Sequence, residues 1–391
     1  MKISKNESNI LNLTNFCKGI AIAWVVLVHY QGRWFGWQGV HIFIVLSGFG
    51  LTYSCLSRNE NPQGKAWYFR RLRKVLPVYW LTVLCSLPLL IIIQIFQEKI
   101  KPDLVQTFLD FFLLRNFFEQ FMSGPTSSFW YVPFILSCYL VFPLLYGFLV
   151  KCSTIWDYLL FLLAVSIIEF VYRALAIYWL DGLPIIYTHS QFFGLFPDTV
   201  TPLDRHPEQI FGLFQRRAPF GFFPSRIAEF TLGALGAIAL IRDNHKVNQI
   251  LLNRYTGLVG ILIWIGGQIL LCVGLWGWIF ADFVISLGLI LWILYLAYFC
   301  QKFTSSVFKW ITLLGVWSYY IYLTHEPFIR ALQGTVRKLF SEGINLSTGI
   351  ASVLIFGLTI TLVYVASLLI QKFDRSKIPD QIVHKMSTLL G

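Results

Sequence analysis

Charge is what this sequence has least of. Charged side chains make up only 13% of the 391 residues, whereas apolar residues make up 57%. An ordinary soluble domain has about 25% charged and roughly 45–50% apolar residues. So little charge with so much apolar surface excludes a disordered chain, and a soluble fold of this length could not bury 36 Phe, 18 Tyr and 14 Trp. The composition indicates a polytopic membrane protein.

The sequence also lacks the patterns of a disulfide framework, a zinc site or a nucleic-acid-binding protein. Its seven Cys form no CxxC pair and lie in or beside apolar runs, which favours a packing role. The net charge is +12, but no Lys/Arg-rich tract with interleaved aromatic residues lies outside the apolar runs. We therefore expect the cations to meet membrane lipids, with no nucleic-acid partner and no metal ion.

Apolar runs long enough to cross a bilayer recur along the chain. A crossing helix needs about 20 mainly apolar residues. The sequence predicts an all-α transmembrane helical bundle, a single membrane domain over residues 1–391 with about ten spans at 12–31, 37–56, 75–96, 129–150, 156–178, 222–241, 255–275, 277–300, 311–333 and 347–371. The apolar segment 104–118 is shorter and carries Asp110 and Arg115, so we expect it to be interfacial or re-entrant.

The distribution of Lys and Arg predicts the orientation of these spans. Placing the N-terminus inside puts most of the 31 Lys and Arg residues on the inner side. We therefore expect both termini to be cytoplasmic and the protein to lie in the cell (inner) membrane. The proline-rich connection at about 180–221 then faces outward, where His189, Asp204, Arg205 and His206 either contact a polar acceptor or are simply solvated.

Ionisable groups inside the predicted spans are candidates for function, because placing them in a membrane is unfavourable. His29 lies near the outer end of the first span, and Lys18 lies eleven residues earlier. Eleven residues make about three helical turns plus 20°, so the two side chains share one face about 16 Å apart. The spacing alone leaves a functional pair and a pair of interfacial anchors both open.

Two later spans carry further polar candidates. His41 opens the second span, and the short connection before it should bring it close to His29, either as part of a site or as an interfacial histidine. Ser318, Tyr322 and His325 share one face of the ninth span through their i, i+4, i+7 spacing. This polar stripe is expected to line a cavity.

Two pairs of opposite charge have helical spacing within predicted spans. Arg226 and Glu229 are three residues apart, and Glu169 and Arg173 are four apart. Pairs of this kind are expected to hold helices together.

A cationic cluster precedes the third span. Arg70, Arg71, Arg73 and Lys74 lie within five residues on the predicted cytoplasmic side. One interpretation is an anchor to anionic lipid. The other is a clamp for the phosphates of a nucleotide-like donor, because guanidinium groups match phosphate oxygens.

Six segments follow one another in a fixed order: NFCKGIAIAWVVLVHY, GVHIFIVLSGFGLTY, FRRLRKVLPVYW, FWYVPFILSCYLVFPLL, FPSRIAEFTLGAL and LGVWSYYIYLTHEPFI. In this order, on about ten spans, they resemble the acyltransferase-3 family of integral membrane acyltransferases, the type that O-acetylates extracytoplasmic polysaccharides. The resemblance covers most of the chain.

The resemblance implies roles for particular residues. Family members carry an Arg, then ten residues, then an essential His in the first span. His29 matches that His, and Lys18 stands at the Arg position. The motif from Arg70 to Arg73 is implied to meet the acyl-CoA donor, and His325 matches the family's late-helix His.

The sequence departs from the family pattern at two acidic positions. Many members have an acidic residue where His41 stands. Many also have a Glu after the Trp of the fourth span, whereas the residues from Tyr131 to Leu136 that follow Trp130 are uncharged. The acid that orients the catalytic histidine in those members is therefore missing from both places.

Together these features predict a membrane acyltransferase that moves an acyl group, expected to be acetyl, from cytoplasmic acyl-CoA to a hydroxyl of an extracytoplasmic or lipid-linked glycan. Acyl-CoA is a co-substrate, and no permanently bound cofactor is expected. A transporter or flippase for a lipid-linked sugar is the alternative, although no inverted repeat is visible.

The expected site divides between two ends of the bundle. His29 is the general base, and His325 is the second catalytic residue, which orients the acceptor or stabilises the oxyanion together with Tyr322. His41 and Ser318 complete the acceptor site. The residues expected to bind the donor are Lys18, Arg70, Arg71, Arg73 and Lys74.

Overall fold

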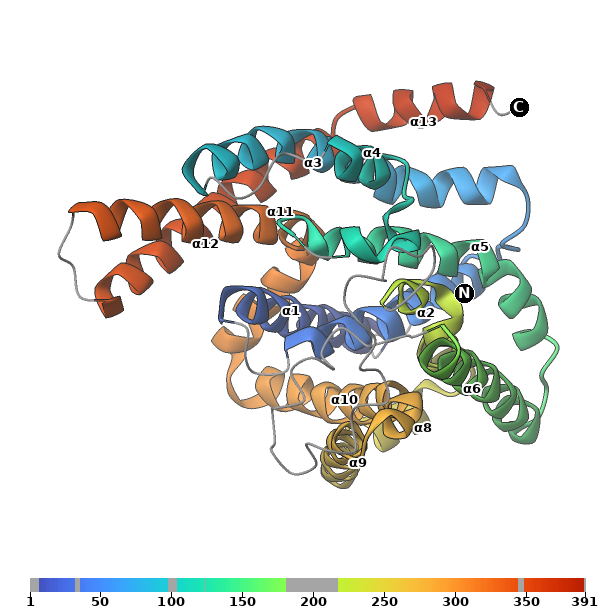
Figure 1. Ribbon diagram of the computed structural model, residues 1–391. Coiled ribbons are helices and arrows are strands. Elements are labelled where there is room, and N and C mark those ends of the chain that lie inside the picture. Colours follow the sequence, from blue (N-terminus) through green and yellow to red (C-terminus); the bar gives the residue numbers. More distant parts are fainter. Residues whose placement is uncertain are drawn as a thin grey trace.

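The computed structural model describes residues 7–31, 36–97, 104–122, 124–180, 217–343 and 348–389, which form helices and no strand (Figure 1). The long helices are α1 (Glu7–Gln31), α2 (Gly39–Ser57), α3 (Lys65–Gln97), α5 (Tyr131–Leu149), α6 (Ile155–Tyr178), α7 (Ile227–Arg242), α9 (Arg254–Cys272), α10 (Leu275–Phe303), α11 (Ser305–Gly343) and α12 (Thr348–Asp374). The shorter helices are α4 (Leu104–Phe111), α8 (Asn244–Leu251) and α13 (Ile378–Leu389). The all-α prediction is confirmed.

Within the described ranges, nine helices are long and apolar enough to cross a membrane. Helix α11, which contains the ninth predicted span at 311–333, is not among them, because polar side chains interrupt its apolar surface. It nevertheless runs parallel to α1. A Cβ atom at Gly315 would lie 1.7 Å from Asn15 O, and Gln333 Nε2 donates to Tyr30 O at 2.8 Å. Helix α11 therefore extends beside α1 over the length of the first span.

Helices α2 and α7 also pack backbone against backbone. A Cβ atom at Gly48 would lie 1.9 Å from Phe230 O, and one at Gly233 would lie 1.8 Å from Val45 O. Small residues permit this close approach between membrane helices, where dispersion contacts and not water exclusion hold the pair together. The pair α1 and α11 and the pair α2 and α7 thus form two tightly packed units of the bundle.

The segment 104–118 folds as the short helix α4 followed by a turn, in agreement with its expected failure to cross the membrane. One face of α4 is exposed through Leu104, Val105 and Phe108, while Asp110 on the other face is buried. This amphipathic segment leads into the turn that begins α5, and that turn contributes to the candidate site.

Candidate active site

The two histidines predicted to be catalytic meet between α1 and α11. His325 Nε2 lies 3.3 Å from His29 Nδ1, although the residues are 296 positions apart in the chain. The rings are edge to face, with centroids 4.9 Å apart. His325 is fully buried, whereas 23% of the His29 side chain is exposed. His29 is therefore the member of the pair that a substrate can reach.

The surrounding carbonyl groups fix which ring nitrogens carry protons. His325 Nδ1 lies 2.7 Å from Tyr322 O and 3.1 Å from Ile321 O, and because carbonyls only accept, Nδ1 donates and Nε2 accepts. His29 Nδ1 lies 2.8 Å from Val25 O and faces that accepting Nε2, so it must also donate. In neutral His29 the unprotonated nitrogen is therefore Nε2, which is free to act as a base.

Glu326 supplies an acid that the sequence prediction missed. Its Oε1 lies 3.9 Å from His29 Nε2, and its side chain is fully buried. The available signal was a carboxylate directly after His325, inside a predicted span. An acid therefore lies beside the base of this chain, although the two positions at which the family pattern places an acid, position 41 and the residues after Trp130, carry no acidic residue.

Glu326 is held by the turn at the start of α5. Ser127 Oγ donates to its Oε1, and the Ser128 N–H donates to its Oε2. Arg330, one helical turn further along α11, places Nη2 3.7 Å from Oε1. The Tyr322 hydroxyl donates to Ser128 O at 2.5 Å and so holds the same turn. Donors of this kind favour the ionised carboxylate.

The turn itself is fixed by a buried ion pair. Arg115 Nη1 lies 3.1 Å from Asp110 Oδ1. The same guanidinium donates to Phe121 O at 2.7 Å, to Thr126 Oγ1 at 3.1 Å and to Thr126 O. Thr126 Oγ1 donates in turn to Asp110 Oδ2 at 3.1 Å. Arg115 thus binds the residue that immediately precedes the two donors to Glu326.

A family model described as an acyltransferase domain, that of acyltransferase-3, matches residues 14–370. The chain belongs to the acyltransferase-3 family. No curated protein and no solved structure matches it. The resemblance read from six segments is confirmed, and the matched region runs from α1 to α12, including both histidines and Glu326. Family and apolar helices together indicate an acyltransferase that is a multi-pass integral membrane protein.

In this acyltransferase His41 lies in a second buried polar cluster. Its Nδ1 is 2.9 Å from Glu229 Oε2, and its Nε2 is 3.8 Å from Asp282 Oδ1. Arg226 lies 3.1 Å from each of these two carboxylates, so the predicted pair with Glu229 is confirmed. The contacts of His41 join α2, α7 and α10 and do not include His29. A role for His41 in acceptor binding stays a prediction.

The Glu169 and Arg173 side chains of α6 are each bonded to another element. Arg173 Nη1 pairs with Asp282 Oδ2 at 2.7 Å, and Glu169 Oε2 accepts from the Ala228 N–H at 2.8 Å. The two residues are neighbours on α6 by helical spacing. The shortest polar contacts of Arg173 are nevertheless with α10, and that of Glu169 is with α7. The pair holds helices together through these separate bonds.

The cationic cluster lies on α3 itself, and two of its members are already paired. Arg73 places Nη1 2.9 Å from Asp374 Oδ1 and Nε 2.6 Å from Asp380 Oδ1. Arg73 therefore joins α3 to the end of α12 and to α13, and it holds the pKa of Asp380 below its ordinary value. Arg70 pairs with Glu60. The site of this acyltransferase thus has fewer free cations than the sequence suggests.

The other three predicted donor-binding cations have no carboxylate partner among the described residues. Arg71 lies 5.4 Å over the Trp67 ring and has a buried Nε without a hydrogen bond in the described part of the chain. Lys74 is exposed, and Lys18 is half-buried on α1. Arg71, Lys74 and Lys18 are therefore available to an anionic ligand.

Ser318 and Tyr322 are buried on the face of α11 that also carries His325, with 7% and 4% exposure. The Tyr322 hydroxyl is committed to Ser128 O. Acceptor binding by either side chain stays a prediction. His189, Asp204, Arg205 and His206 lie outside the described residues.

Proposed function

We propose that this membrane acyltransferase moves an acetyl group from cytoplasmic acetyl-CoA to a hydroxyl of an extracytoplasmic or lipid-linked glycan, in the cell (inner) membrane. The observation that supports the proposal is the partly exposed ring of His29, whose unprotonated Nε2 lies beside the buried carboxylate of Glu326. Hydroxyl groups become nucleophiles when a positioned base removes their proton. An exposed imidazole backed by an acid suits that task.

The donor binds from the side where α3 begins. Arg71, Lys74 and Lys18 contact its phosphates, because they are the predicted cations that no described carboxylate neutralises. Eleven residues of α1 separate Lys18 from His29, which at 1.5 Å per residue is about 16 Å. The extended pantetheine arm bridges this distance and delivers the thioester to His29.

The acyl transfer then needs His29 to accept one proton and to give it back. His29 Nε2 takes the proton of the acceptor hydroxyl while its oxygen attacks the thioester carbonyl. The imidazolium so formed keeps its Nδ1 hydrogen bond to Val25 O and turns an Nε2–H toward Glu326. When the tetrahedral intermediate collapses, the carbon–sulfur bond breaks and the imidazolium returns the proton to the CoA thiolate. The products are the ester and CoA.

His325 and Glu326 position the base. The accepting Nε2 of His325 keeps the proton of His29 on Nδ1, and Glu326 stabilises the charge that develops on the ring. Both side chains are fully buried, which supports a positioning role for them behind the more exposed His29. Moving a sugar across a membrane requires no base, whereas acyl transfer to a hydroxyl uses His29 as the base and His325 and Glu326 to position it.

The test uses purified protein in nanodiscs, acetyl-CoA labelled in the acetyl group and a panel of glycans with and without a lipid anchor. We expect wild-type protein to move the label onto at least one glycan, with an equal amount of free CoA released. CoA release without a labelled glycan would reject the acceptor class. If no labelled donor is consumed, while the same protein in sealed liposomes moves a lipid-linked sugar across the bilayer, the flippase alternative would replace the proposal.

A further inference from the structure

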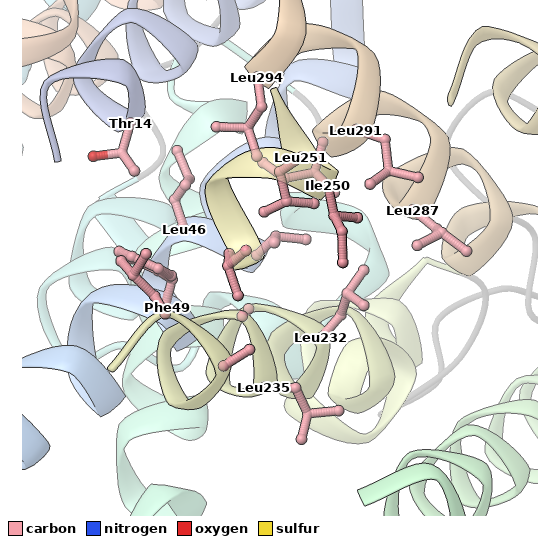
Figure 2. Close-up of a pocket in the computed structure, with 17 residues that line it drawn as sticks. Thr14, Leu46, Phe49, Leu232, Leu235, Ile250, Leu251, Leu287, Leu291 and Leu294 are labelled. Carbon is pink, nitrogen blue, oxygen red and sulfur yellow. The ribbon is translucent and has the colours of Figure 1, made fainter. Parts of the chain in front are cut away.

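A cavity of about 350 Å³ lies between α2, α7 and α10 and is closed on one side by α8 (Figure 2). Seventeen residues line it, and Thr14 supplies the one side-chain hydroxyl among them. The others are aliphatic, aromatic or glycine; Leu46, Phe49, Leu232 and Leu291 point into the space in Figure 2. A sugar or a phosphate would find no charged partner here.

The cavity is separate from the candidate active site. Thr14 precedes His29 by fifteen residues of α1, which corresponds to about 22 Å along the helix axis. No residue of the His29, His325 and Glu326 group lines the cavity. Its occupant is therefore unrelated to the reacting atoms.

A space of this kind has to be filled by something apolar. Protein interiors are close-packed, and a Leu/Ile/Phe-lined cavity of about 150 Å³ already excludes water and takes up benzene. The present cavity is more than twice that size. Ile250, which lines it from α8, is 52% exposed, so the space reaches the outer surface of the bundle. In a membrane the apolar molecule at that surface is lipid.

The charges around α8 indicate which lipid. Arg242, Lys246 and Arg254 lie on α8 or beside it, against the single acidic residue Asp243 between positions 242 and 254. Arg242 donates to the carbonyls of Cys152 and Ser153, and none of the three cations forms an ion pair within the described ranges. Cations at the membrane surface attract anionic headgroups.

We propose that this cavity binds one alkyl chain of an anionic phospholipid, whose headgroup contacts Arg242, Lys246 and Arg254. The chain enters beside Ile250 and lies between α8 and the apolar faces of α7 and α10. The bound lipid completes the packing of these helices. The site does not depend on the acyl-transfer proposal.

The experiment uses the full chain in nanodiscs of phosphatidylglycerol that carries a photoreactive diazirine within one acyl chain. We expect cross-links to concentrate on peptides from 232–240 and 287–294, and to exceed those on the lipid-facing helix α9. The same diazirine chain on phosphatidylcholine should give weaker labelling of these peptides. Label spread equally over α9 and the cavity peptides would overturn the proposal, and equal labelling by both lipids would overturn its headgroup assignment.

Two matched glycine variants sharpen the test. Gly236→Leu fills the cavity, since a Cβ atom there has only Phe49 Cδ2 nearby, at 3.8 Å. Gly266→Leu is the control on α9, where a Cβ atom has nothing within 4 Å. We expect cavity labelling to fall to the α9 background in the first variant and to stay at the wild-type level in the second. Unchanged labelling in Gly236→Leu would overturn the proposal.

A surface variant covers the case in which Gly236→Leu does not fold. Lys246→Gln should remove part of the preference for phosphatidylglycerol over phosphatidylcholine, and an undiminished preference would overturn the headgroup assignment. A third arm replaces the lipid with a diazirine-bearing long-chain acyl-CoA. If this molecule labels the cavity peptides and phosphatidylglycerol does not, the cavity is a donor-chain site and the lipid proposal fails.

Discussion

Glu326 is the single residue on which the proposed chemistry of His29 most depends, because its carboxylate faces the nitrogen that becomes charged. Glu326→Gln keeps the size of the side chain but removes that charge. We expect kcat to fall roughly 10²-fold with little change in the KM for the donor. Steady-state kinetics of the purified variant measure both values. An unchanged kcat would show that the carboxylate is only a structural partner of the α5 turn.

Arg71 and Arg70 form a matched pair of arginines on α3. Arg71 has no carboxylate partner among the described residues, whereas Arg70 already pairs with Glu60. Arg71→Gln should raise the KM for acetyl-CoA about ten- to hundredfold, because a charge-assisted phosphate contact contributes roughly 1.5–3 kcal/mol. Arg70→Gln should change it little. If the two variants have equal KM values, Arg71 does not bind the donor.

Some of the site could be predicted at this scale and some could not. His29 and His325 could be predicted as candidates from helical spacing and from the order of the family segments. Each signal lies within a single span, the first for His29 and the ninth for His325. Glu326 could not be predicted as a site residue in this way. Adjacent residues of a helix point about 100° apart, so Glu326 does not share the helix face of His325. It reaches His29 only through the parallel packing of α11 on α1, which no local pattern encodes.

The turn between α4 and α5 is the structural element that supports the site. Arg115 binds Thr126, and the next two residues donate to Glu326. We expect Arg115→Met to lower kcat, and its effect to be strongly reduced when Ser127→Ala is already present, because both act through the same contact. A double-mutant cycle on kcat measures this coupling. Additive effects would show that Arg115 stabilises the fold without positioning Glu326.

The same segment offers a control ion pair. Arg217 Nη2 lies 2.6 Å from Glu119 Oε1, and the Arg217 N–H donates to Glu119 Oε2 at 2.8 Å, so Glu119 is bonded to Arg217 and not to Arg115. Glu119→Gln should therefore combine additively with Ser127→Ala. Coupling of equal size in both cycles would mean that any disturbance of this segment reaches the site.

Arg73 belongs to the junction of α3, α12 and α13. Its guanidinium is paired with Asp374 and Asp380, so we expect Arg73→Gln to loosen α13 and leave the KM for the donor nearly unchanged. Asp380→Asn should produce the same change. Hydrogen exchange of residues 378–389 reports the loosening. A raised KM for the donor, with the hydrogen exchange of α13 as slow as in the wild-type protein, would show that Arg73 binds the donor.

The whole molecule could be predicted as a helical membrane bundle because hydropathy depends on composition alone. Two features need more than mean hydropathy. The span at 311–333 could be predicted from its apolar run, yet the mean hydropathy of α11 is too low for it to count among the nine apolar helices of the described residues, because α11 carries the polar side chains of the site. Helix α3 begins at Lys65, ten residues before the predicted span, because its cationic first turns are helical too. Charges at a span end mark the membrane surface and not the end of the helix.

Chemical rescue of His29→Ala tests the central claim most directly, namely that Nε2 of His29 is the base. The substitution leaves a space at a partly exposed position, where added imidazole can stand in for the ring. The account predicts that acetyl transfer falls roughly 10²–10⁴-fold and rises again with imidazole concentration, while wild-type protein does not respond. Near-normal transfer by His29→Ala without imidazole would contradict it.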